Sequence, residues 1–178
     1  AFIALMASRL EEVKNIELAL GALKEVVPQY SNIGLIVIGE GSLRSKLEAK
    51  VGELCIEEFV KFVGWQEDVQ SYMQTSDVFI NTSNHEGYCL SLIEAAEAGL
   101  PTITTDVGLV GDVLTHEHVR ICEVGDHYCF VRELQAAIEN RDMLRDLADK
   151  ARLRREEVRL PKETYLSLYK ENVYAAAE

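Results

Sequence analysis

The sequence predicts an α/β domain in which helices cover both faces of a parallel sheet of about six strands. Three observations predict this class. Short, unbroken apolar runs recur along the chain, and segments whose apolar residues lie three or four positions apart alternate with them. Glycine-containing turns separate the two kinds of segment. With 178 residues, the chain is long enough for one such domain with its own core.

The apolar runs have the length and composition of strands that are buried on both faces. β-branched and aromatic residues dominate several of them, and each run is shorter than a typical helix. The predicted strands are Phe2 to Ala7, Ile33 to Ile38, Phe59 to Val63, Asp77 to Thr82, Thr102 to Thr105 and Val119 to Val124.

Helices are expected wherever apolar side chains fall on one face. The first runs from Ile16 to Val27, with Asn15 as its predicted N-cap. Asp68 to Ser76 predicts a short helix, and Met143 to Val158 a long one with a charged outer face. The other predicted helices carry the stripes Leu43, Leu47, Val51 and Leu54; Leu90, Ile93, Ala96 and Leu100; Val131, Leu134, Ala137 and Ile138; and, after Pro161, Tyr165, Leu168, Tyr169 and Val173. Strands alternating with these helices make a Rossmann-like three-layer domain.

The composition excludes two classes of partner. The chain has 18 basic and 30 acidic residues, a formal net charge of −12. Such a charge produces no field that attracts nucleic acid or anionic lipid to the molecule as a whole. Any phosphate site must therefore be built locally, from a few basic side chains and backbone amides.

The cysteines predict buried thiols rather than disulfides or a zinc site. Cys55, Cys89, Cys122 and Cys129 lack C-x-x-C spacing, and three of them lie in apolar runs. Thiols of this kind are typical of a reducing compartment. No apolar run approaches the roughly 18 residues of a membrane span, and the first residues do not resemble a basic leader. We therefore expect a cytoplasmic protein.

The stretch Asn84 to Pro101 carries the predicted chemistry. It is a glycine-containing turn followed by a helix, with Glu86 in the turn and Glu94 on the helix. A helix that begins just beyond a parallel strand directs unpaired backbone N–H groups at the carboxyl edge of the sheet, where anions bind. At about 1.5 Å per residue, Glu94 lies roughly 6 to 9 Å from the expected position of the phosphate, and a ribose fits this gap. This geometry fits a sugar nucleotide, and the alternative is two ordinary surface carboxylates.

Three other carboxyl-end loops hold candidate ligand groups. Arg9 and Lys14 follow the first strand, where two cations can flank a pyrophosphate; the alternative is a pair of solvated loop charges. Gly39 and Gly41 allow a tight turn after the second strand. Trp65, after the third, either stacks on a base or caps the core. The absence of G-x-G-x-x-G and Walker sequences weakens a dinucleotide or P-loop interpretation.

Two motifs resemble those of a known family. Glu86-Gly87-Tyr88-Cys89-Leu90 begins a segment in which seven residues separate Glu86 from Glu94, and this resembles the E-x7-E signature of retaining glycosyltransferases of the GT-B fold. Arg9 and Lys14 match the R-x4-K element of the same enzymes. The chain most closely resembles the C-terminal, donor-binding half of family 4 enzymes, also described as glycosyl transferases group 1.

The resemblance implies three catalytic residues. Arg9 and Lys14 bind and neutralise the donor diphosphate, which is also the leaving group, and Glu86 holds donor-sugar hydroxyls near the anomeric carbon. No metal is implied, because the two cations take its place, and the histidines lack the neighbours of a metal site.

The resemblance also implies a nucleotide site. Backbone N–H groups at the helix start contribute to the diphosphate site, and Glu94 holds the ribose hydroxyls. The implied donor-binding residues, besides the three catalytic ones, are Gly39, Gly41, Trp65, Gly87, Tyr88, Cys89, Leu90 and Glu94. The sequence departs from the family at Ser8, where glycine is frequent, at Leu109, which fills a second glycine position, and at Asp112, roughly in the place of a glutamate.

The resemblance covers one half of an enzyme. We expect residues 1–178 to form a single donor-binding domain of a longer protein, without the N-terminal acceptor domain, and to transfer little sugar alone. The helix at about 161–176 is expected to cross back to that missing domain, leaving Tyr165 and Tyr169 exposed. The implied acceptor is a glycan or a lipid-linked sugar, as in polysaccharide biosynthesis. The implied location is cytoplasmic, including the cytoplasmic face of the membrane.

Two other functions stay open. Nucleotide-sugar epimerases share the GT-B architecture and bind a similar ligand, but they require further acid and base residues in the cleft. A non-catalytic Rossmann-like binding module would not bind a nucleotide at the predicted cleft. The pair of R-x4-K and E-x7-E motifs favours a transferase over both.

Overall fold

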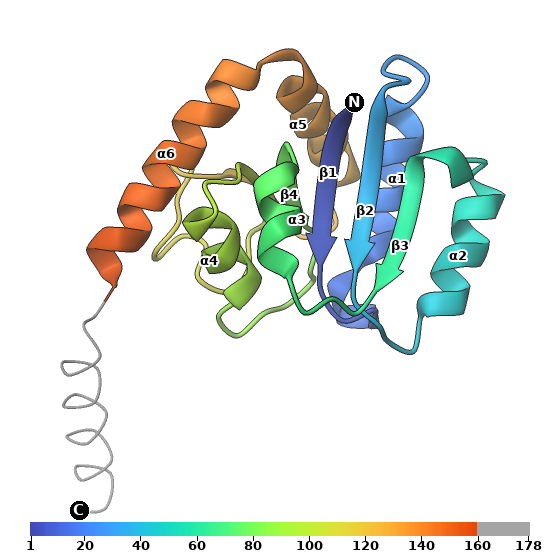
Figure 1. Ribbon diagram of the computed structural model, residues 1–178, viewed down its shortest axis with the longest axis horizontal. Helices are drawn as coiled ribbons and strands as arrows, with labels where there is room; N and C mark the ends of the chain where they lie inside the picture. The colour runs from blue at the N-terminus through green and yellow to red at the C-terminus, as the bar shows by residue number, and fades with distance from the viewer. Residues whose placement is uncertain (160–178) are drawn as a thin grey trace, which may run out of the picture.

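The computed structural model describes residues 1–159, which form a six-stranded sheet. Helices pack around this sheet (Figure 1). The strand order is β3-β2-β1-β4-β5-β6, and every pairing is parallel. The predicted α/β class and the six strands are therefore confirmed. The strands are β1 (Phe2–Ala7), β2 (Ile33–Ile38), β3 (Val60–Gly64), β4 (Val78–Asn81), β5 (Thr102–Thr105) and β6 (Arg120–Cys122).

The helices fall on the two faces of this sheet. One hydrophobic cluster joins the sheet to α1, α2 and α5, and a second joins it to α3 and α4. Figure 1 shows α1 behind the sheet and α3 and α4 in front of it. The described helices are α1 (Ile16–Val26), α2 (Arg44–Glu53), α3 (Val69–Thr75), α4 (Leu90–Glu97), α5 (His127–Glu139) and α6 (Arg141–Val158), with short 3-10 turns η1 (Glu12–Lys14) and η2 (Glu57–Phe59).

The parallel topology brings all the strand-end loops to one edge. The arrowheads of β1, β2 and β3 point to the same edge in Figure 1, where the loops after these strands gather. In open parallel sheets, ligands bind at the carboxyl ends of the strands. The fold therefore collects the candidate residues at one place.

Two local predictions were wrong. Asn15 does not cap α1 with its side chain: it adopts the left-handed conformation (φ 45°), and its amide donates to Asn84 Oδ1 instead (3.1 Å). Leu90 is 67% exposed rather than part of the buried stripe. Because α4 begins only at Leu90, after a left-handed Cys89, this residue lies on the open side of the first turn.

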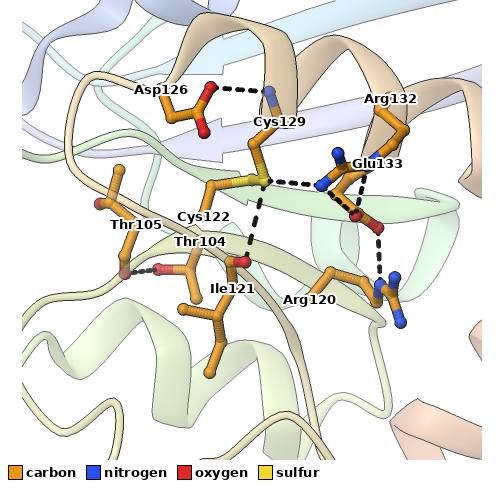
Figure 2. Close-up of a disulfide and its surroundings, with 9 residues drawn as sticks. All are labelled: Thr104, Thr105, Arg120, Ile121, Cys122, Asp126, Cys129, Arg132 and Glu133. Carbon is orange, nitrogen blue, oxygen red and sulfur yellow. Dashed lines mark hydrogen bonds and ion pairs between the residues drawn. A yellow bond between two sulfur atoms is a disulfide. The ribbon is translucent and has the colours of Figure 1, made fainter.

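The prediction of four free thiols was also wrong. Cys122, at the end of β6, forms a disulfide with Cys129 in the first turn of α5 (Figure 2). Asp126 caps α5 by accepting a hydrogen bond from the Cys129 backbone (2.9 Å), and this tight turn brings the two cysteine Cα atoms within 5.7 Å. Of the other cysteines, Cys89 is a buried thiol, as predicted, and Cys55 is exposed.

Two further predictions concern membrane spans and the last helix. No helix within residues 1–159 is both long and apolar enough to cross a membrane. The predicted helix after Pro161, with Tyr165 and Tyr169, lies outside the described residues.

Candidate functional site

The loops after β1 and β2 are joined by backbone hydrogen bonds. Leu10 N–H donates to the Glu40 carbonyl (3.0 Å), and Leu43 N–H donates to the Leu10 carbonyl (2.9 Å). A Cβ on Gly39, whose φ is 127°, would lie 1.9 Å from the Ser8 carbonyl oxygen, and one on Gly41 would lie 2.4 Å from that of Leu10. Both glycines are therefore required by the close approach of two backbones.

A pocket of about 320 Å³ opens beside this loop pair. Arg9 and Glu94, which lie on different elements and 85 positions apart in the chain, both line it. Both residues are exposed, and within residues 1–159 neither side chain forms an ion pair. The pocket walls also include Gly39, Glu40, Trp65 and Gln66.

Trp65 belongs to the pocket and not to the core. Trp65 is 68% exposed, so its interpretation as a cap of the core is wrong. An exposed indole in the wall of a pocket provides a flat apolar surface on which a base can stack. Gln66, which the sequence did not single out, donates to the Val63 carbonyl (2.7 Å) and holds this loop in place.

Lys14 and Glu86 meet at the next pair of loops. Lys14 Nζ lies 2.5 Å from Glu86 Oε1, and the two side chains are only 15% and 13% exposed. Two bonds clamp the loops that carry them: Thr82 Oγ1 donates to the Lys14 carbonyl (2.9 Å), and Asn84 N–H donates to the Val13 carbonyl (2.7 Å). The ion pair is therefore built into the backbone arrangement. Neither residue lines the Trp65 pocket.

The surroundings of Glu86 favour its ionised form. Burial raises the pKa of this carboxyl, but hydrogen bonds from Lys14 and Ser83, the charge of Lys14 and the Cys89 thiol outweigh burial. The net pKa lies below the ordinary value of 4.5. Glu86 is therefore a carboxylate at neutral pH, able to accept hydrogen bonds from hydroxyl groups.

The start of α4 offers unused backbone donors. Within the described residues, the N–H groups of Tyr88, Cys89 and Leu90 donate no hydrogen bond. The left-handed Cys89 (φ 66°) turns the chain into the helix at this point. Free N–H groups at the positive end of a helix bind anions.

The loop after β5 closes on the same segment. Leu109 N–H donates to the Tyr88 carbonyl (3.3 Å), and a Cβ on Gly108 would lie 3.0 Å from the same oxygen. Leu109, which replaces a glycine of the family pattern, is buried in the core, and Asp112 is exposed. A Cβ on Gly87 would meet no atom within 4 Å among the described residues, so the contact of Gly87 with a ligand stays a prediction.

Behind the site lies a set of polar residues that the sequence patterns did not reveal. Asn81, Ser83 and Thr104 are buried and joined by hydrogen bonds that end on Glu86. The signal that could have revealed them is their position at the end of an apolar strand. A polar side chain that is buried there must have hydrogen-bond partners. No cluster of three potential metal ligands occurs among residues 1–159, and metal independence stays a prediction.

The parallel sheet, with unused helix-start donors and a tryptophan-lined pocket at its carboxyl edge, is an α/β domain of the Rossmann-like class. A family model described as glycosyl transferases group 1 matches residues 1–154, and the chain belongs to that family.

Individual proteins show the same relationship. A human component of phosphatidylinositol N-acetylglucosaminyltransferase is 32% identical over 120 residues, which cover 66% of this chain and 25% of the human protein. The solved structure of Anabaena Alr3699/HepE in complex with UDP and glucose has a TM-score of 0.86 at 21% identity, covering 98% of this chain and 48% of that one.

A third comparison concerns an isolated domain. The C-terminal domain of a glycosyl transferase group 1 family protein (LpcC) from Francisella tularensis has a TM-score of 0.81 at 19% identity. The match covers 88% of this chain and 85% of that domain. The chain thus spans about a quarter of the human relative but most of a solved C-terminal domain.

Proposed function

We propose that this chain is the donor-binding domain of a retaining glycosyltransferase, which moves a hexosyl group from a nucleotide-diphosphate sugar to an acceptor. One observation carries the proposal: Arg9, Trp65 and Glu94 converge on one pocket from separate elements. A cation, an aromatic face and a carboxylate match the diphosphate, base and ribose of such a donor. The family supports the transferase class.

The diphosphate is proposed to lie between Arg9 and the start of α4. The chain's net charge of −12 makes a local cationic site necessary. Arg9 supplies paired N–H donors, and the free N–H groups of Tyr88, Cys89 and Leu90 supply fixed ones. These donors would stabilise the negative charge that develops on the leaving diphosphate.

Lys14 is proposed to act with them while it stays paired to Glu86. An ammonium group has three N–H donors, and one is used in the contact with Glu86 Oε1. The other two are available to a phosphate oxygen. The ion pair then keeps the cation next to the sugar-facing carboxylate.

The remaining donor contacts follow from the pocket. Glu94 would accept hydrogen bonds from ribose hydroxyls, and Trp65 would stack on the base. Glu86, ionised at neutral pH, would accept hydrogen bonds from donor-sugar hydroxyls. With this polarity it positions the sugar and does not serve as a general acid.

We further propose uridine as the base and glucose or N-acetylglucosamine as the sugar. The Anabaena structure contains UDP and glucose, and the human relative is named for N-acetylglucosamine transfer. The same proposal includes an acceptor domain, a glycan or lipid-linked acceptor and metal independence. It also includes a cytoplasmic location, with the membrane face, which rests on the family resemblance, because the Cys122–Cys129 disulfide removes the argument from free thiols.

Titration calorimetry tests the proposal. The purified chain is titrated with UDP, GDP and ADP in EDTA, beside Arg9→Ala and the control Lys24→Ala, an exposed cation on α1. We expect one diphosphate to bind preferentially, with at least tenfold weaker binding in Arg9→Ala only. Equal binding by both variants, or none by any protein at millimolar concentration, contradicts the proposed site and favours the non-catalytic module.

A further inference from the structure

A line of buried polar side chains runs from β5 through β4 to Glu86. Asn81 lies within hydrogen-bond distance of Thr104 Oγ1 (3.0 Å) and of Ser83 Oγ (2.9 Å), and Ser83 Oγ lies 2.7 Å from Glu86 Oε1. Thr104, Asn81 and Ser83 are 0%, 6% and 1% exposed. We call these three residues and Glu86 the relay.

A proton count limits the direction of the hydrogen bonds in the relay. A serine hydroxyl carries a single proton, so Ser83 cannot donate both to Glu86 and to the Asn81 amide oxygen. If Ser83 donates to Glu86, the group of Asn81 that faces Ser83 must itself be a donor. The structure places the Asn81 amide nitrogen at Thr104 and its oxygen at Ser83, so this direction requires the amide turned by 180°, with the NH2 facing Ser83 and the oxygen facing Thr104.

Thr104 completes this arrangement. Its hydroxyl lies near both the Asn81 side chain and the Thr105 carbonyl (2.9 Å), and it can donate to the amide oxygen of Asn81. Thr104 then donates to Asn81, Asn81 to Ser83, and Ser83 to Glu86. The protons of this chain then point toward the carboxylate, and the Thr105 carbonyl, 2.9 Å from Thr104 Oγ1, receives no proton from that hydroxyl.

The opposite direction of the hydrogen bonds requires Glu86 to be protonated. If Ser83 donates to Asn81, its oxygen can bond Glu86 only when Glu86 is protonated and donates. Lys14 Nζ, at 2.5 Å from the same Oε1 atom, opposes that protonation. The cation at one side of Glu86 therefore selects the direction of the relay on the other side.

We propose that Ser83 is a positioning residue for the donor sugar: its hydroxyl, oriented by Asn81 and Thr104, holds the Glu86 carboxylate in the rotamer that contacts the sugar. The proposal rests on the proposed function of Glu86. Oε1 is held by Lys14 and Ser83, which leaves Oε2 to accept from a sugar hydroxyl. A carboxylate held from two sides loses little rotamer freedom when a sugar binds.

The charged and titratable groups around Glu86 come from two further elements. Lys14 faces it from the loop after β1, and the Cys89 thiol faces it from the start of α4. Burial raises the pKa of this thiol, and the charge of Glu86 raises it as well, against a hydrogen bond from Ser91. Cys89 therefore stays a neutral donor while Glu86 titrates.

Carboxyl NMR of the chain labelled with 13C at the glutamate Cδ tests the relay without any ligand. The Glu86 signal is assigned by its loss in Glu86→Gln, and its pKa is followed in Ser83→Ala, Thr104→Val and the control Thr102→Val. Thr102 is also a buried threonine of β5, but it donates to the Leu100 carbonyl, outside the relay. Thr104→Val and Thr102→Val remove the same hydroxyl with the same change of shape.

We expect the pKa of Glu86 to rise by about half a unit or more in Ser83→Ala, because the carboxylate loses a hydrogen-bond donor. The rise should be smaller in Thr104→Val, where the Ser83 donor remains but is less strongly polarised by its neighbours. Thr102→Val should leave it unchanged. An unchanged pKa in folded Ser83→Ala overturns the proposal. If Ser83→Ala does not fold, equal shifts in Thr104→Val and Thr102→Val overturn it.

A binding experiment then separates the positioning role from the proposed function. In Ser83→Ala we expect UDP to bind within about twofold of the parent, while the extra affinity of UDP-glucose or UDP-N-acetylglucosamine over UDP is reduced about tenfold. An unreduced sugar increment overturns the positioning role. Failure of UDP to bind the parent chain overturns the proposed function, whereas the carboxyl titration still decides the direction of the relay.

Discussion

Lys14 and Glu86, 72 positions apart in the chain, form an ion pair of 2.5 Å at the carboxyl edge of the sheet. The pair joins the loop after β1 to the loop after β4, on neighbouring central strands. It connects the two motifs that the sequence carries, R-x4-K and E-x7-E, before any ligand is bound.

Removal of the Lys14 charge should destabilise the domain. In Lys14→Met, Glu86 remains a largely buried carboxylate without its cation, at a cost of about 1 to 3 kcal/mol at pH 7. The control is Lys46→Met, which breaks the exposed pair with Glu17 and should leave the stability nearly unchanged. Urea unfolding measures both, and equal losses in the two variants would contradict a structural role for the buried pair.

The same pair predicts a pH dependence. The pKa of Glu86 is lower in the folded chain than its ordinary value of 4.5, so its contribution to stability is present above that value. It is lost as the pH falls through the lower, folded pKa. The stability difference between the parent and Lys14→Met should therefore shrink between neutral pH and pH values below 4.5. A difference that stays constant over this range would mean that Glu86 is not the partner that matters.

Gly39 should tolerate no side chain. A Cβ would meet the Ser8 carbonyl oxygen at 1.9 Å, at a φ of 127°, so Gly39→Ala should cost about 2 kcal/mol or more. Gly87→Ala is the matched control, since nothing lies within 4 Å of its Cβ and its φ is not in the left-handed region. Thermal unfolding of the two variants checks this, and a parent-like Gly39→Ala would refute the backbone contact.

The disulfide between Cys122 and Cys129 should contribute measurably to stability. The separation of seven residues closes a short loop, for which the loss of chain entropy corresponds to about 2 to 3 kcal/mol. Cys129→Ser, or a reducing agent, should lower the midpoint of urea unfolding. Cys55→Ser, which removes an exposed free thiol, should not change it. If mass spectrometry of the unreduced chain finds Cys122 and Cys129 unlinked, the assignment of the disulfide is contradicted.

Trp65 provides its own optical test. It is the single tryptophan of the chain and is 68% exposed. Base stacking would move the indole out of water, so UDP should quench its emission or shift it to shorter wavelength. Emission that UDP leaves unchanged, while calorimetry detects binding, would place the base elsewhere.

The strands were predictable because each is an apolar run with no helical periodicity. Phe2–Ala7 and Ile33–Ile38 match the predicted bounds, whereas the last strand shrinks from Val119–Val124 to Arg120–Cys122. Val124 is exposed there, since the chain already turns toward α5. A run of apolar residues does not tell where an edge strand stops pairing.

The site was predictable only in part, because a sequence motif indicates which residues belong to a site but not which residues they contact. Arg9 and Glu94 share a pocket, as the motif resemblance implied. The pairing of Lys14 with Glu86 depends on two backbone clamps between distant loops, which no local pattern encodes. Ser83 was missed because a serine after a strand resembles an ordinary loop residue until its burial is known.

The central claim is that a nucleotide diphosphate binds where β1, β3 and α4 meet at the carboxyl edge. Amide NMR of the chain during a UDP titration tests it most directly. We expect the largest shifts at the backbone amides of Tyr88, Cys89 and Leu90 and at the Trp65 indole, with none at the Arg152 to Val158 segment of α6. Shifts that avoid the α4 start and Trp65, or that centre on the α6 arginines, would contradict it.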